Sequence, residues 1–189
     1  MIKQNSDFDL PAFAANTALK GFLAAWNRWR GDAIAPKRSE ISLADIPGLM
    51  RGGMLLDAYS PNEIVFRFAG SLYQEMYGFE FTGKNYIDLT ELDMRALRSS
   101  RLWGVVSQPA AAVWTIPNID VLQFIGASVP VVPDNPDEPM KIMQMVVMNR
   151  ELSEASHKER AKQRDAVPYS DRFQYIDIGA GKPDSEVEA

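Results

Sequence analysis

The chain has 189 residues and a net charge of −5, so it lacks the basic surface that binding to duplex nucleic acid requires. Apolar residues make up 46% of it, enough for a sizeable core, and the length suits one domain with terminal extensions. There is no cysteine, which excludes disulfides, thiolate metal sites, iron–sulfur clusters and thiol nucleophiles.

The amino-terminal residues 1–11 are expected to be a flexible lead-in. No apolar run follows Lys3, so this segment does not have the pattern of a signal peptide. No stretch approaches the roughly 20 apolar residues that span a bilayer. We therefore expect a cytoplasmic protein without a membrane span.

Residues 12–30 are predicted to form a helix that ends at Gly31. Its apolar residues recur alternately four and three positions apart, which gives a seam made of Ala15, Leu19, Phe22, Trp26 and Trp29. Tryptophan exposed on such a seam would promote aggregation. We therefore expect this helix to pair two copies of the chain in a homodimer.

Two strands are predicted next, at residues 53–59 and 63–69. The turn residues 60–62 lie between them, so the strands should form a hairpin. Strict alternation places Ile64, Phe66 and Phe68 on one face of the second strand. Val65 and Arg67 then lie on the other face.

Two helices should follow this hairpin. Residues 72–77 fit a short helix ended by Gly78, and residues 90–106 fit a long one. Thr90 and Asp93 match a capping box at the start of the long helix. We expect a buried stripe and an exposed arginine stripe on it: Met94, Leu97 and Val105 in the first, Arg95, Arg98 and Arg101 in the second.

Three strands, at residues 110–116, 120–132 and 140–149, complete a domain that spans residues 12–150. The last two are joined by a loop rich in proline and acidic residues. The extension 151–180 is expected to contain a charged helix and, at residues 173–178, to be able to add a sixth strand at the sheet edge. The acidic tail 181–189 is expected to be disordered.

The order of these elements, together with an ordered set of short motifs, resembles a family of bacterial single-domain PAS-like proteins long catalogued only as a domain of unknown function. The resemblance covers about residues 20–150 and lies in these residues: Trp26 with Trp29 and Arg30, Pro36 and Arg38, Asp45 to Pro47, Phe66 and Arg67 with Gly70, and Gly78 with Thr82 and Gly83. The density of prolines at positions 130, 133, 136 and 139 departs from the family pattern, so the tip of the last hairpin should differ.

The resemblance implies an α+β fold, in which a five-stranded antiparallel sheet carries helices on one face and the amino-terminal helix packs on the other face or pairs subunits. It also implies a sensory or regulatory role, since PAS domains bind small ligands between the long helix and the sheet or act as dimerisation modules. It identifies no cofactor. Residues that such a pocket would use here are Phe66, Arg67, Phe68, Tyr73, Tyr77, Leu97 and Trp114.

Two interpretations remain open for most of these residues. Arg67 can anchor a carboxylate or phosphate ligand, or it can pair with Asp57 on the neighbouring strand. The aromatic residues can line a ligand pocket or form ordinary core. The arginines of the long helix can contact an acidic partner or a phosphate, or form a solvated face.

No catalytic or metal-binding motif stands out. His157 is the only histidine and lies in a charged segment, which argues against a histidine-ligated haem, a multi-histidine metal site or a serine-type triad.

The first functional hypothesis is a non-enzymatic PAS-like module that binds a small ligand or a partner protein and signals through its terminal helices. Any output should then pass to another protein, because no output domain is evident. The alternative is a small-molecule carrier or a cone-fold isomerase-type enzyme on a curved sheet. The enzyme would need an acid–base pair, for which Asp57 or Asp120 with Tyr73 is the candidate.

Overall fold

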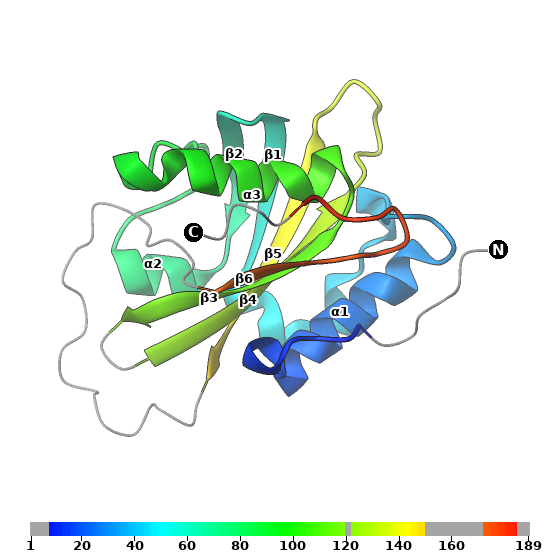
Figure 1. The fold of residues 1–189 in the computed structure, drawn as a ribbon, viewed down its shortest axis with the longest axis horizontal. Coiled ribbons are helices and arrows are strands. Elements are labelled where there is room, and N and C mark those ends of the chain that lie inside the picture. The colour runs from blue at the N-terminus through cyan, green and yellow to red at the C-terminus, as the bar shows by residue number, and fades with distance from the viewer. Residues whose placement is uncertain (1–7, 120–121, 150–171, 185–189) are drawn as a thin grey trace.

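The computed structural model describes residues 8–119, 122–149 and 172–184, and its central element in this part of the chain is an antiparallel sheet with strand order β2-β1-β5-β4-β3-β6 (Figure 1). The strands are β1 (Gly53–Ser60), β2 (Glu63–Ala69), β3 (Ala111–Ile119), β4 (Leu122–Val131), β5 (Met140–Asn149) and β6 (Phe173–Ile176). The α+β antiparallel architecture is confirmed. The sheet has six strands instead of five because β6 pairs with β3 at its edge.

Helix α1 (Thr17–Arg30) begins later than predicted. The side-chain oxygen of Asn16 accepts hydrogen bonds from the backbone N–H groups of Ala18 (2.9 Å) and Leu19 (3.2 Å), which makes Asn16 the N-cap. Residues Ala12–Ala14 form a separate 3₁₀ turn. Gly31, with a φ of 53°, ends α1 as predicted, since other residues are strained in that conformation.

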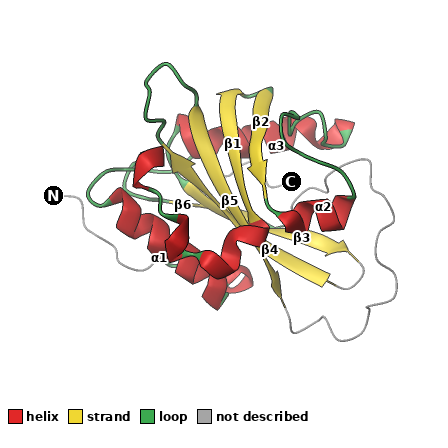
Figure 2. Cartoon of the chain, turned by 180° about the vertical axis from the view of Figure 1, so that it is seen from behind, coloured by secondary structure: helices red, strands yellow, loops and turns green. Residues whose placement is uncertain are grey.

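The apolar seam of α1 packs on the sheet of its own chain, against β4 and β5 (Figure 2). Leu19, Phe22 and Trp26 are fully buried, and the indole N–H of Trp26 donates to the carbonyl of Pro130 at 3.0 Å. The reason for predicting a homodimer through residues 12–30 was therefore wrong. The seam does not need a second copy to cover it.

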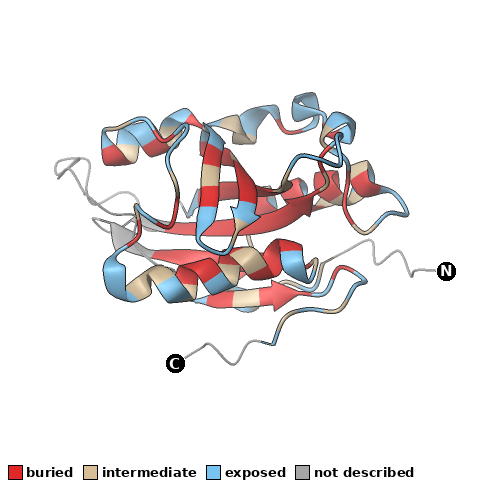
Figure 3. Cartoon of the chain, turned by 90° about the horizontal axis from the view of Figure 1, so that it is seen from above, coloured by how far each residue is buried: buried red, intermediate tan, exposed pale blue. Residues whose placement is uncertain are grey.

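Helices α2 (Ser71–Tyr77) and α3 (Arg95–Ser107) cover the opposite face of the sheet. Figure 3 shows that the buried residues gather mainly in the strands between these helical layers. Gly78, with a φ of 76°, ends α2 in the left-handed conformation. Among the described residues, no helix has the length and apolar character to cross a bilayer.

The start of α3 differs from the prediction. Thr90 is buried, and its hydroxyl donates to the carbonyl of Tyr86 (2.9 Å), so it does not cap a helix. A 3₁₀ turn, Leu92–Met94, occupies the predicted first turn, and α3 begins only at Arg95. The capping box is therefore wrong.

The predicted stripes on α3 are also wrong in part. Val105 is buried as predicted, but Leu97 is only half-buried and Arg98 is buried. The guanidinium of Arg98 lies 4.8 Å from the ring centroid of Tyr86, a cation–π contact that offsets part of the cost of its burial. The buried stripe on the helix is Arg98, Ser99, Leu102, Val105 and Val106.

Candidate ligand-binding site

The sheet separates the residues predicted to contact a ligand. Phe66, Tyr73, Tyr77 and Trp114 are buried on the α3 face, Arg67 and Phe68 line a groove near the opposite face, and Leu97 is half-buried on α3. The predicted set is therefore not one cavity. The two groups belong to different parts of the molecule.

On the α3 face the aromatic rings pack against one another. Phe81 is central, with ring centroids 5.0 Å from Phe66, 6.0 Å from Tyr73, 5.5 Å from Tyr77 and 4.5 Å from Phe79. Contacts at these distances stabilise a core beyond the burial of the rings themselves. The cluster thus has the character of close-packed interior.

The polar atoms of these aromatic side chains are also used within the fold. The hydroxyl of Tyr73 donates to the carbonyl of Gly52 at 2.9 Å. Burial raises the pKa of Tyr73 well above its ordinary value, and Tyr86 and Tyr77 add to the effect. The indole N–H of Trp114 donates to Ser128 Oγ (2.9 Å), which also accepts from Gln144 Nε2 (2.8 Å).

A β-bulge in β2 explains why Phe66 and Phe68 lie on different faces. Phe68 pairs with Leu55 and Phe66 pairs with Leu56, so Arg67 is an extra residue opposite a continuous β1. Such a bulge shifts the alternation of side chains by one position. The prediction that Phe68 shares a face with Phe66 is wrong, because it assumed unbroken alternation.

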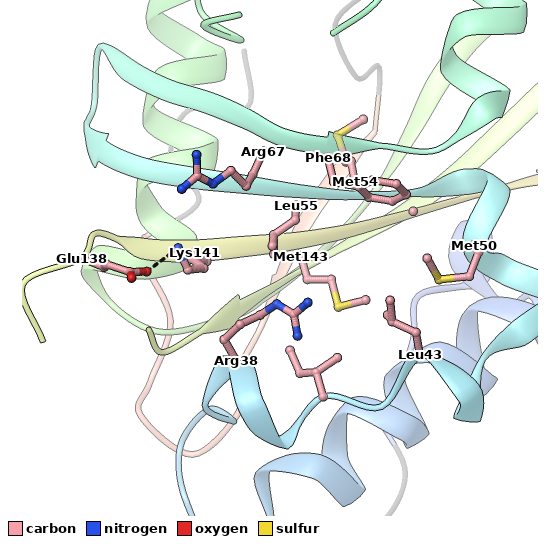
Figure 4. A pocket seen from close by; sticks show the side chains of 12 residues that line it. Arg38, Leu43, Met50, Met54, Leu55, Arg67, Phe68, Glu138, Lys141 and Met143 are labelled. Carbon is pink, nitrogen blue, oxygen red and sulfur yellow. Dashed lines mark ion pairs between the residues drawn. The ribbon is translucent and has the colours of Figure 1, made fainter. Parts of the chain in front are cut away.

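The groove beside Arg67 has a volume of about 400 Å³, within the range of small-molecule sites. Strands β1, β2 and β5 form its floor, and the segment between α1 and β1 forms its wall (Figure 4). It has an apolar part and a charged part. The apolar part includes Ile41, Leu43, Met50, Leu55, Phe68 and Met143, and the charged part consists of Arg38, Arg67, Glu138 and Lys141.

Arg38 reaches the groove from a segment fixed at several points. Its backbone N–H donates to the carbonyl of Val132 at 2.9 Å. The next residue, Ser39, donates to Asp134 Oδ1 from its backbone N–H (3.0 Å) and from its hydroxyl (2.6 Å). These bonds, with Lys37 and Arg38 as electrostatic partners, lower the pKa of Asp134. The segment that carries Arg38 is therefore held in place by the β4–β5 loop.

A charge network lies at one end of the groove. The buried carboxylate of Asp57 is 2.8 Å from Lys141 Nζ and 3.3 Å from Arg67 Nε, and Lys141 is also 3.2 Å from Glu138. Burial alone would lower the pKa of Lys141, but its hydrogen bonds to Asp57 and Glu138 outweigh burial and raise the pKa. The predicted pairing of Arg67 with Asp57 is confirmed, although Lys141 is the closer partner.

Asp57 does not form the acid–base pair with Tyr73 that an isomerase would need. Asp57 pairs with Lys141 and Arg67 in the groove network, whereas Tyr73 belongs to the α3-face core. Asp120 and His157 lie outside the described residues. Within the described ranges, no three histidine, aspartate or glutamate side chains are grouped so that they could hold a metal ion.

The arginines of α3 are not a simple solvated face. Arg101 is half-buried, 4.6 Å from the ring centroid of Phe173. Arg95 donates to the carbonyls of Thr90 (3.0 Å) and Asp88 (2.9 Å). These contacts give the two side chains roles within the fold.

Sequence reasoning missed most of the groove. Arg38 was noted only as part of a family motif, and Lys141 and Met143 were not considered. Strand β5 is almost continuously apolar, so its alternation does not indicate which face each residue occupies. The one available signal was Lys141 itself, the only charged residue in this strand.

Comparison with protein-family models matches residues 14–122 to the PAS domain, which is more than half of the chain. No curated protein sequence gives a significant match.

Proposed function

The chain belongs to the PAS domain family, whose members are in general sensory or regulatory modules, and on that premise we propose that it senses a small ligand in the groove beside Arg38 and Arg67. The observation behind this proposal is the contrast between the two faces. On the face of the sheet that α2 and α3 cover, aromatic rings pack closely against one another, while the groove combines apolar surface with charged side chains.

The wall of the groove suggests how binding would be transmitted. The indole N–H of Trp29, in α1, donates to Asp45 Oδ2 at 2.7 Å, and Ser39 bonds Asp134 in the β4–β5 loop. The segment that contains Ser39 and Asp45 thus links the groove to α1. A ligand that favours one position of this segment would shift the population of α1 packings on the sheet.

We further propose that the module is non-enzymatic, that it is cytoplasmic and that its output passes to a partner protein. Homodimerisation remains a prediction. It would require a surface other than the centre of the apolar seam of α1, because Leu19, Phe22 and Trp26 are buried against the sheet of the same chain.

The test is a metabolite library screened by ligand-observed NMR against three proteins. Phe68→Glu introduces a carboxylate into the groove at a side chain that is already 41% exposed, and Leu92→Glu is the control at a residue that is 82% exposed outside the groove. Library binders should bind the wild type and Leu92→Glu alike. Their affinity for Phe68→Glu should fall at least about tenfold, which corresponds to about 1.4 kcal/mol.

Equal affinity of the binders for all three proteins would contradict the proposal. So would a library that contains no binder for the wild type.

A further inference from the structure

We infer that the ligand of this groove is an amphipathic monoanion, a single carboxylate attached to an unbranched apolar body. The inference rests on the proposed function and specifies the chemistry of the same site. Three features carry it: the balance of charge, the unequal distribution of polarity, and the free hydrogen-bonding capacity of two arginines.

The balance of charge favours one negative charge on the ligand. The lining and the carboxylate beneath it supply three cations, Arg38, Arg67 and Lys141, and two acids, Asp57 and Glu138. Asp134 also interacts with Arg38, but it lies outside the lining and faces Lys37 as well. One cation in excess complements a monoanion, whereas a cationic ligand would meet repulsion and a dianion would lack a second partner.

The distribution of polarity favours a ligand with two unlike ends. Figure 4 places Arg67, Lys141 and Glu138 toward one end of the groove and Met50 and Leu43 toward the other. The floor between them is Leu55 and Met143. Unbranched, flexible methionine side chains adapt to an apolar chain of variable shape.

The guanidinium groups of Arg38 and Arg67 have N–H donors available for a ligand. Among the residues that the structure describes, Arg38 forms no ion pair and no side-chain hydrogen bond, although it is half-buried. Arg67 contacts Asp57 through Nε, and its side chain is 66% exposed. The planar fork of arginine matches the geometry of a carboxylate and can bind it through two parallel hydrogen bonds.

The size of the groove favours a small molecule over a protein partner as the ligand. A stable protein interface covers about 800 Å² on each side. A groove of about 400 Å³ that is lined by twelve residues accommodates a ligand, or at most one inserted side chain. A protein that inserts a side chain here is therefore an outcome for the experiment to exclude.

Calorimetric titration of the full chain with hexanoate, octanoate and decanoate tests the inference. Affinity should rise with chain length by up to about fourfold per methylene, until the apolar part of the groove is filled. Octanol, which has the same chain and no charge, should bind at least about tenfold more weakly than octanoate. Octyltrimethylammonium should not bind measurably.

Arg38→Gln and Arg51→Gln provide a matched pair of variants. Arg51 forms an exposed pair with Glu75 and does not line the groove. Arg38→Gln should weaken octanoate at least about tenfold and leave octanol unchanged, whereas Arg51→Gln should change neither. Arg67→Gln should weaken octanoate less than Arg38→Gln, because its Nε is already used by Asp57.

The outcomes separate this inference from the proposed function. If octanol binds as tightly as octanoate and Phe68→Glu weakens both, or if Arg38→Gln has no effect while Phe68→Glu abolishes binding, the groove is the site but the ligand class is wrong. The class is also wrong if no alkyl carboxylate binds while library compounds still depend on Phe68. If octanoate binds and neither Phe68→Glu nor Arg38→Gln reduces its affinity, this inference fails, and the proposed function fails with it if library binders are equally insensitive to Phe68→Glu.

Discussion

The side chains on the two faces of strand β2 differ in how completely they are buried. Toward α3, Phe66 is buried in a cluster of rings centred on Phe81, while Phe68 is 41% exposed beside the groove. These two aromatic residues are separated only by the bulge at Arg67. Because of this one extra residue in β2, Phe66 points into the core and Phe68 lies beside the groove.

The comparison also shows that a PAS fold does not determine which side of the sheet offers a site. The resemblance directs attention to the space beneath the long helix. In this chain aromatic side chains occupy much of that space, and a larger open volume with charged side chains, among the residues that the structure describes, lies beside the segment between α1 and β1.

The largest difference is expected from truncation of one aromatic residue on each side. Phe81→Ala should lower the free energy of unfolding by about 3–5 kcal/mol, because it leaves a cavity among four packed rings. Phe68→Ala should cost only about 1–2 kcal/mol, because its side chain is 41% exposed. Urea unfolding of both variants measures the difference, and equal costs would make Phe68 part of the core.

The next largest effect is expected at the charged end of the groove. Lys141→Met should cost about 3 kcal/mol of unfolding free energy, because it leaves the buried carboxylate of Asp57 with only the more distant Arg67. The double variant Asp57→Leu with Lys141→Met should recover most of this loss. Urea unfolding again provides the measurement, and a double variant no more stable than Lys141→Met would refute the ion-pair explanation.

Arg51→Gln is the matched control for this prediction. It removes an ion pair whose side chains are 67% and 54% exposed, so it should change the unfolding free energy by less than about 1 kcal/mol.

Most of the fold was predictable from sequence, because its strands follow simple patterns. The ranges of β2 and β5 agree with the predicted ones, and β6 was anticipated as an edge strand. The candidate site was predictable only in part. A bulge has no clear signature in the sequence of β2, and the position of Arg38 depends on hydrogen bonds to the distant residues Val132 and Asp134.

The α3 side should dominate the loss of stability at alkaline pH. Burial raises the pKa of Tyr175 to about 12, with Arg101 acting in the opposite direction, whereas an unfolded tyrosine ionises near pH 10. The contribution of neutral Tyr175 to the free energy of unfolding is therefore complete below about pH 10 and is lost as the pH rises toward about 12.

Tyr175→Phe isolates this contribution. The variant should lose about 1 kcal/mol near pH 7, because it lacks the hydrogen bond from the hydroxyl to the carbonyl of Arg101. Its stability should then fall less steeply than that of the wild type above pH 10, although Tyr73 and Lys141, with raised pKa values, keep some of the slope in both. Urea unfolding between pH 8 and pH 11 measures the slopes, and parallel curves would contradict the assignment to Tyr175.

The smallest effect on stability is expected in the groove wall. Ser39→Ala removes one exposed hydroxyl bond to Asp134 and should change the unfolding free energy by less than about 1 kcal/mol. It should nevertheless weaken octanoate several-fold, because the segment that presents Arg38 becomes less well fixed. Calorimetry on the variant checks this, and an unchanged affinity would mean that Ser39 does not help to position Arg38.

The most direct test of the central claim is methyl NMR of the chain labelled at methionine and isoleucine and titrated with octanoate. Met50 and Met143 line the groove, whereas Ile87 and Ile142 lie in the core beneath α3. The account predicts large shifts for Met50 and Met143 and small shifts for the two isoleucines. Large shifts for Ile87 and Ile142, with Met50 and Met143 unchanged, would place the ligand beneath α3 and contradict it.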